Sequence, residues 1–187
     1  MTAPTITSQL DPSSVAVTQW RRRVFRISSL CEIFFGSIWA SNAIRSYLPF
    51  EASLALLAGL VVFAMSIRAT RGTAPRPAGS DARALEHRIT VASVVQIVAA
   101  IVLPVALVAT GHGTFVMPVI VASVGVLFVW LDREVHLVRL RVLGTALVLV
   151  PVVTTIALSG TVQTTSLLAV AGTLMVATGV AGVRTLR

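Results

Sequence analysis

Six long apolar stretches separated by short polar links dominate the chain. They cover about residues 24–48, 50–67, 89–110, 114–131, 138–159 and 162–183. Each stretch is close to the roughly 20 residues that an α-helix needs to cross the hydrocarbon core of a bilayer. Strands of a membrane barrel would alternate apolar and polar residues over about ten positions, whereas these stretches are continuously apolar. The pattern predicts an all-α bundle of six transmembrane helices.

The links between these stretches alternate in length. Residues 46–51, 111–113 and 160–161 form short turns, and residues 68–88 form the longest link. This alternation predicts three tight hairpins within a single transmembrane domain, residues 20–187. Residues 1–19 are rich in Ser, Thr and Pro and carry only one charge, which predicts a disordered tail.

All fifteen basic residues are arginines, and they follow the same alternation. They precede the first stretch, lie between the second and third and between the fourth and fifth, and follow the last. Arg45 is the single exception. Because cytoplasmic loops are enriched in arginine and lysine, this distribution predicts that both termini and the 68–88 loop are cytoplasmic. The absence of lysine is typical of a GC-rich genome, and we expect a multi-pass protein of a bacterial cell membrane.

The composition excludes a soluble domain and explains the charge. Hydrophobic residues make up 56% of the chain and charged residues 12%, with a mean hydropathy of +0.90, whereas a soluble domain is about one quarter charged. A net charge of +8 would suggest nucleic acid as a partner of a soluble protein. Here the arginines flank apolar stretches, so we expect the lipid bilayer as the partner and no nucleic acid.

Glu32 is the only carboxylate expected deep in the membrane, about 12 Å from the cytoplasmic end of its helix. A charge at that depth is costly unless it faces the bundle and has a partner. At 100° per residue its neighbours on one face are small or polar, which supports an inward orientation. These neighbours are Ser28, Gly36, Trp39, Ala43 and Ser46.

Gln96 is the expected partner of Glu32. The first and third helices run in the same direction, so the two side chains have similar depth, and we predict a contact between them. Two interpretations follow. The carboxyl can bind a proton or cation on a transport path, or the Glu32–Gln96 contact can fix the pairing of two helices.

Residues near the outer end of the first helix extend this candidate site. Asn42 and Arg45 end that helix, and Arg45 can hold an anionic solute at an outer mouth. The alternative is that Arg45 reaches the lipid headgroups or pairs with Glu51. The complete candidate site for a solute or proton is Glu32, Gln96, Arg45, Asn42, Ser28 and Trp39.

Two further sequence features concern packing and docking. Small residues favour a close approach of helices; they are Gly36 in the first helix and a row at every fourth position of the last, namely Thr165, Ala169, Thr173, Ala177 and Ala181. We expect this row to pack inside the bundle or across a dimer. The mixed-charge run of residues 132–136 is expected to be a solvated link, with partner docking as the alternative.

Motifs for chemistry are missing from the chain. We find no serine-nucleophile elbow, no paired cysteines, no zinc-binding His-Glu-x-x-His motif and no phosphate-binding loop. We therefore expect no enzyme activity, no cofactor and no metal. The leading hypothesis is a membrane protein that binds or passes a small solute or proton, alone or as a transporter subunit. The alternative is a non-transporting scaffold, or a regulatory or stress-related protein, that acts through a partner membrane protein or a second copy.

Overall fold

The computed structural model describes residues 15–45, 47–72 and 80–186 and, within these ranges, contains helices and no strands. Six helices are long and apolar enough to cross a membrane, which confirms the predicted all-helical architecture. In chain order they are α1 (Val15–Arg45), α2 (Pro49–Ala69), α3 (Ser80–Ala109), α4 (Val116–Val135), α5 (Val138–Ala157) and α6 (Gly160–Thr185), with a short 3-10 helix, η1 (Gly113–Phe115), before α4.

Three helices extend beyond the apolar stretches at the arginine-rich end. Helix α1 begins at Val15, inside the predicted tail, and α3 begins at Ser80, inside the predicted 68–88 loop. Helix α4 continues through the mixed-charge run to Val135. Apolar stretches mark the hydrocarbon boundary, and a helix continues beyond it wherever polar helix-forming residues follow. Residues 1–14 and 73–79 lie outside the described residues.

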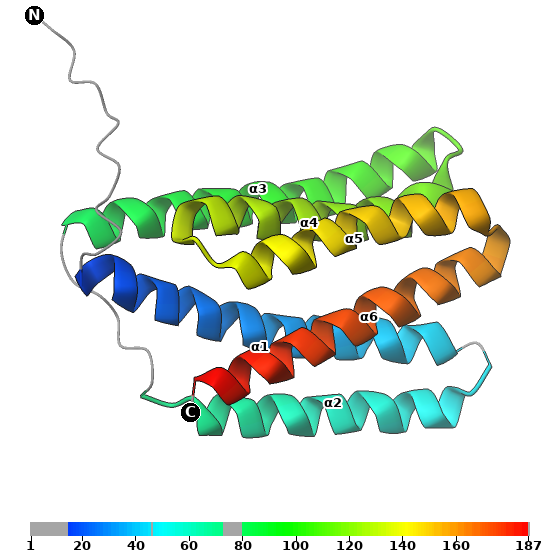
Figure 1. Ribbon diagram of the computed structural model, residues 1–187. Coiled ribbons are helices and arrows are strands. Elements are labelled where there is room, and N and C mark those ends of the chain that lie inside the picture. Colours follow the sequence, from blue (N-terminus) through cyan, green and yellow to red (C-terminus); the bar gives the residue numbers. More distant parts are fainter. Residues whose placement is uncertain (1–14, 46, 73–79, 187) are drawn as a thin grey trace, which may run out of the picture.

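The helices form two layers of three, with α1, α2 and α6 in one and α3, α4 and α5 in the other (Figure 1). Helix α1 packs most extensively against α6, and α4 packs most extensively against α5. The layers meet through buried apolar side chains of α1, α4, α5 and α6, including Trp39, Phe128, Leu147, Leu167 and Met175. Helices α2 and α3 therefore lie on the outside of the bundle.

Glycines bring α1 and α6 into close contact. A methyl group at Gly36 would lie 2.8 Å from the carbonyl oxygen of Gly172, and one at Gly172 would lie 2.5 Å from the Ala40 nitrogen. Gly125 and Gly144 make the same kind of contact between α4 and α5, with a corresponding distance of 2.6 Å in each direction. These positions have no room for a side chain, so the backbones of each pair pack directly.

The row of small residues predicted to pack in the last helix does not make this contact. Thr173, Ala177 and Ala181 are exposed, and Thr165 and Ala169 are half-buried. The buried face of α6 carries Gly172, Gly179 and Gly182 instead. The prediction that this row packs inside the bundle is therefore wrong. The buried glycines lie on a different face of α6 from the row of small residues at every fourth position.

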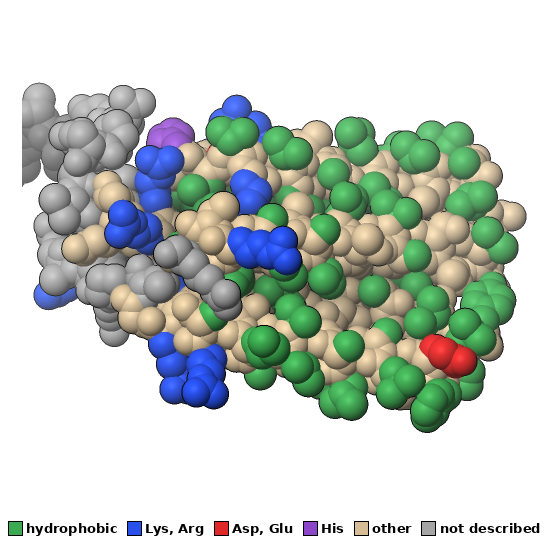
Figure 2. All heavy atoms as spheres, turned by 60° about the horizontal axis from the view of Figure 1, so that its bottom comes forward, with side chains coloured by type: hydrophobic (Ala, Val, Ile, Leu, Met, Phe, Trp, Pro, Cys, Tyr) green, Lys and Arg blue, Asp and Glu red, His purple; other side chains and the backbone are tan. Residues whose placement is uncertain are grey.

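The surface combines one charged end with long apolar sides. Arginine side chains gather at one end of the face shown in Figure 2, and hydrophobic side chains cover much of the remaining length. Helix α3 has no buried residue among those whose burial is described, and α2 buries only Ala52 and Ser66. Uncovered apolar helices of this length match the surface that a bilayer contacts.

Candidate functional site

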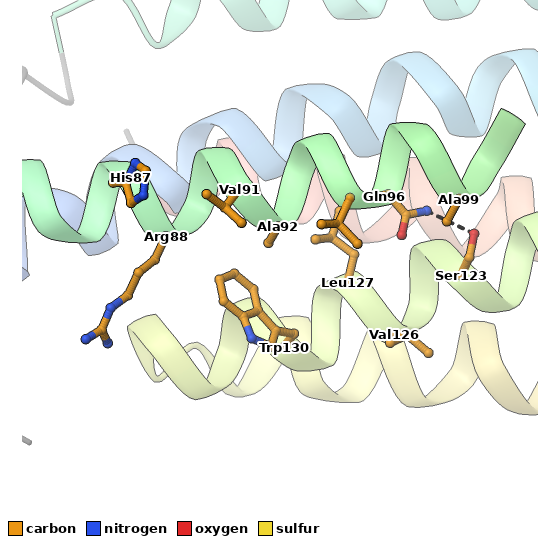
Figure 3. A pocket seen from close by; sticks show the side chains of 11 residues that line it. His87, Arg88, Val91, Ala92, Gln96, Ala99, Ser123, Val126, Leu127 and Trp130 are labelled. Atoms are coloured by element: carbon orange, nitrogen blue, oxygen red, sulfur yellow. Dashed lines mark hydrogen bonds between the residues drawn. The ribbon is translucent and has the colours of Figure 1, made fainter. Parts of the chain in front are cut away.

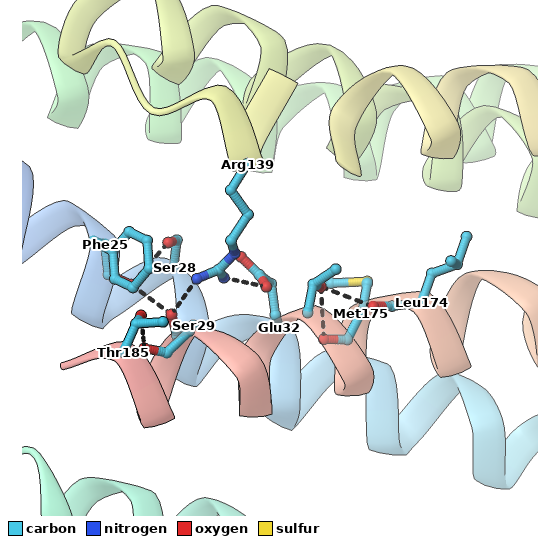
Figure 4. A network of polar contacts seen from close by, with 10 residues as sticks. Phe25, Ser28, Ser29, Glu32, Arg139, Leu174, Met175 and Thr185 are labelled. Carbon is cyan, nitrogen blue, oxygen red and sulfur yellow. Dashed lines mark hydrogen bonds and ion pairs between the residues drawn. The ribbon is translucent and has the colours of Figure 1, made fainter. Parts of the chain in front are cut away.

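Glu32 forms an ion pair with Arg139 across the two layers (Figure 4). Glu32 belongs to α1 and has no exposed surface, and Arg139 comes from the first turn of α5. Arg139 Nη2 donates to Glu32 Oε2, and Arg139 Nη1 donates to Ser29 Oγ at 2.8 Å. The Arg139 Cζ atom lies 4.6 Å from the centre of the Phe25 ring, which adds a cation–π contact. Three residues of α1 thus hold one guanidinium of α5.

The predicted contact between Glu32 and Gln96 is wrong. Gln96 Nε2 donates to Ser123 Oγ at 2.9 Å, which joins α3 to α4 within one layer. Equal depth does not bring two helices together, and α3 makes few contacts with α1. The Arg139 side chain instead reaches Glu32 from the neighbouring layer.

Arg139 is the partner of Glu32 that the sequence analysis does not identify. Its place before the fifth apolar stretch predicts only an arginine that flanks that stretch on the cytoplasmic side. Its helical position offered a signal, because it shares a face with Leu143 and Val150, which lie in or against the core, at spacings of four and eleven residues. Arg141, two positions later, points to the exposed side.

The face of α1 that carries Glu32 points inward, as predicted. Ser28, Gly36, Trp39 and Ala43 are all buried along with it. Ser46, the last member of the predicted face, lies outside the described residues. The polar and small side chains lie against the other helices because lipid offers no hydrogen bonds to a serine or a carboxylate.

Polar groups around the ion pair remain partly unpaired. Ser29 Oγ, which accepts from Arg139, donates to the Phe25 carbonyl oxygen at 2.7 Å. The Thr178 hydroxyl of α6 donates to the Leu174 carbonyl oxygen at 2.8 Å and adjoins the Glu32 carboxyl. Glu32 Oε1 and Arg139 Nε are buried and have no hydrogen-bond partner within the described chain. The ion pair therefore leaves one acceptor oxygen of Glu32 and one donor nitrogen of Arg139 without a hydrogen bond.

Neither of two described cavities is lined by Glu32. One, of ≈340 Å³, lies at the arginine-rich end and includes Arg21, Arg22 and Phe25 in its wall. Phe25 also stacks on Arg139, whose side chain is 19% exposed. The second cavity lies between α3 and α4 on the outer side of the bundle. The carboxyl of Glu32 has no exposed surface, and Arg139 is its partly exposed neighbour.

The remaining predicted site residues do not join this pair. Asn42 is exposed, and its Nδ2 donates to the Ile38 carbonyl oxygen of its own helix at 3.0 Å. Arg45 is exposed at the end of α1, about 20 Å along the axis from Glu32. Trp39 is buried in the core. The structure brings together only Ser28 and Glu32 of the six predicted residues, and Ser28 donates to the Phe25 carbonyl oxygen.

A second buried acid, Asp132, lies in the run that was expected to be solvated. It is 1% exposed and accepts a hydrogen bond from Arg141 Nε at 2.7 Å. The expectation of a solvated link is therefore wrong for Asp132. Asp132 lies on the inner face of α4, seven positions after buried Gly125 and four positions after buried Phe128.

Other arginines at this end also bind neighbouring helices. Arg21 Nη2 of α1 donates to the His136 carbonyl oxygen in the α4–α5 turn at 3.1 Å. Arg26 Nε of α1 donates to Thr70 Oγ1 after α2 at 3.0 Å. Arg88 of α3 pairs with Glu134 of α4 at 3.5 Å. The arginine-rich end is thus a set of links between helices.

Comparison with known protein families, with curated proteins and with solved structures finds no match for this chain. Its class follows from its own fold, which is that of a helical bundle with six helices able to span a membrane. The site adds one buried ion pair between the two layers. Among the described residues there is no group of three or more His, Cys, Asp or Glu side chains that could hold a metal ion.

Proposed function

We propose that the protein is a non-transporting membrane scaffold, whose closed bundle presents its outer helices to partners in the bilayer. The enclosure of Glu32 carries this proposal. The Glu32 carboxylate is fully buried, pairs with Arg139 and lines neither described cavity. A transport site needs a route by which water or solute reaches the binding group.

The packing around the pair supports a fixed bundle. Beyond Glu32 the interior is occupied by large apolar side chains that are at most 2% exposed, among them Ile33, Leu143, Leu147 and Leu167. Dense packing of this kind resists small displacements, because removal or insertion of a methylene changes the stability. The Glu32–Arg139 pair then acts as a structural link between the two layers.

The orientation and the membrane belong to the same proposal. We place the arginine-rich end in the cytoplasm, with both termini inside, and assign the protein to a bacterial cell membrane. The distribution of arginines supports this orientation. The sides left uncovered by the bundle, chiefly α2 and α3, then face lipid or a partner helix.

Reconstitution in liposomes that contain a proton-sensitive dye tests the scaffold against proton passage. We expect the wild type and Glu32→Gln to give the same proton flux as protein-free liposomes under an imposed pH gradient. Glu32→Gln should instead lower the yield of folded protein, since it leaves Arg139 without its anionic partner. Glu51→Gln, an exposed change at the start of α2, is the matched control and should leave the yield unchanged.

The opposite pattern would overturn the proposal. It consists of a flux above that of protein-free liposomes that disappears in Glu32→Gln while the folded yield is preserved. The assay should be repeated with small anions and cations. A flux of any of these ions that disappears in Glu32→Gln, with the folded yield preserved, would identify a transported solute.

A further inference from the structure

We propose that the groove between α3 and α4 binds an anionic phospholipid of the leaflet at the arginine-rich end. The groove has a volume of ≈660 Å³ and opens on the outer side of the bundle (Figure 3). Its walls are His87, Arg88, Val91, Ala92, Val95, Gln96, Ala99, Ser123, Val126, Leu127 and Trp130. Six of these eleven residues are aliphatic, which suits an acyl chain.

The length and depth of the groove match one leaflet. From His87 to Ala99 it follows α3 for about 18 Å at 1.5 Å per residue, and half of a hydrocarbon core is about 15 Å thick. It begins at the arginine-rich end and ends where Gln96 donates to Ser123. A lipid with its headgroup at that end would therefore place its chain along the groove and not across the bundle.

The charge at the mouth of the groove favours an anionic headgroup. Arg88 extends from α3 toward the arginine-rich end in Figure 3, and 53% of its side chain is exposed. Its contact with Glu134 is long, at 3.5 Å, so the guanidinium keeps donors for a phosphate. Basic pockets between membrane helices on the cytoplasmic side are typical binding sites for anionic lipids.

Trp130 forms an aromatic wall of the groove beside Val91 and Ala92. Its side chain projects from α4 toward α3 in Figure 3. Indole rings prefer the boundary between headgroups and hydrocarbon. Trp130 also provides a probe, because a brominated acyl chain in the groove would quench its fluorescence. The inference uses the orientation proposed above, but it does not depend on the scaffold role.

The test compares phosphatidylglycerol and phosphatidylcholine that carry the same brominated chains, with the protein in bilayers of unbrominated phosphatidylcholine. The Trp130 signal is the difference between the wild type and Trp130→Phe. We expect phosphatidylglycerol to reach half-maximal quenching at about one fifth of the mole fraction that phosphatidylcholine needs. A factor of five corresponds to about 1 kcal/mol, the contribution of one arginine near an anionic surface.

Variants test separately whether Arg88 selects the anionic headgroup and whether the acyl chain lies in the groove. Arg88→Gln should remove the fivefold preference, whereas Arg83→Gln, the same change at an exposed position of α3 that does not line the groove, should keep it. Glu134→Gln should increase the preference, because it removes the carboxylate that competes for Arg88. Ala92→Leu should weaken quenching by both lipids, and Ala106→Leu, outside the groove, should not.

Three results would overturn the proposal. Equal quenching by both lipids in the wild type would show that no headgroup is selected. An equal loss of preference in Arg83→Gln and Arg88→Gln would show a general charge effect. A dimer in detergent that Ala92→Leu dissociates, with no lipid preference, would show that a second copy occupies the groove.

Discussion

At the scale of single residues, the pairing with Arg139 explains how α1 can bury the carboxylate of Glu32. A buried charge whose partner is removed costs several kcal/mol, whereas replacement of both partners by apolar residues can be neutral or stabilising. The two partners also differ in exposure. Glu32 has no exposed surface, and the Arg139 side chain is 19% exposed. The guanidinium can therefore retreat toward the arginine-rich end, and the carboxylate cannot.

This difference predicts unequal losses of stability. Arg139→Gln should lower the free energy of unfolding by about 3–5 kcal/mol, and Glu32→Gln by about 1.5–3 kcal/mol. The double variant Glu32→Met/Arg139→Leu should recover most of the loss. Unfolding by sodium dodecyl sulfate in mixed micelles, followed by far-ultraviolet circular dichroism, measures these values.

Arg83→Gln and Glu51→Gln provide the controls for charge, since both residues are exposed. Each should change the free energy of unfolding by less than about 0.5 kcal/mol. A double variant as unstable as the sum of the single variants would show that the pair does not act as a unit.

The sequence predicted one member of this pair and not the other. Glu32 is conspicuous because it interrupts an apolar stretch, and its inward orientation follows from the helical period. Arg139 is inconspicuous because arginines are common where a membrane helix begins. The prediction of Gln96 as the partner is wrong for a different reason. The sequence indicates how deep a residue lies along its helix, but it does not indicate which helices are neighbours.

At the scale of helices, α1 packs most extensively against α6, and glycines bring their backbones into direct contact. The atoms nearest to Gly36 and Gly172 belong mostly to backbone, and backbone cannot move aside as a flexible side chain can. An added methyl group must therefore push the two helices apart.

We predict that Gly172→Ala and Gly36→Ala each lower the free energy of unfolding by about 1–3 kcal/mol. The same detergent titration measures the loss. Gly113→Ala is a suitable control, because the nearest atom to a methyl group there would be Val108 Cγ2, at 4.0 Å.

Ala177→Leu tests the row of small residues that the sequence favoured. Ala177 is exposed in α6, so the larger side chain should be tolerated within the single chain. A loss as large as that of Gly172→Ala would show that this row packs against another molecule. The row was selected by its period alone, and a helix so rich in Ala, Gly and Thr offers several such rows.

Helix existence was predictable and helix ends were not. Six apolar stretches are strong signals because each must satisfy its own backbone in lipid. The ends of α3 and α4 lie beyond those stretches, where polar residues continue the helix. Asp132 became buried for this reason, although its neighbours in sequence suggested a solvated turn.

At the scale of the whole molecule, the proposed orientation can be measured by cysteine labelling. The background is Cys31→Ala, which removes the native thiol. Ala84→Cys lies near the arginine-rich end, and Thr110→Cys lies at the opposite end; both positions are exposed. In intact cells a membrane-impermeant maleimide should label Thr110→Cys and leave Ala84→Cys unlabelled, because the arginine-rich end is inside.

Labelling after cell disruption shows that both thiols are reactive. With that control in place, labelling of Ala84→Cys alone in intact cells would reverse the orientation. It would also remove the anionic leaflet from the mouth of the α3–α4 groove, so the lipid measurement should be interpreted together with this one.

The long separation of Glu32 and Arg139 in sequence has a consequence for synthesis. They are 107 residues apart, so at about 5–20 residues per second α1 exists for about 5–20 s before α5 is made. During that interval the carboxyl of Glu32 has no guanidinium, and α1 is the least apolar of the six candidate spans. We therefore expect a chain that stops after α4 to be degraded by membrane proteases faster than the full chain.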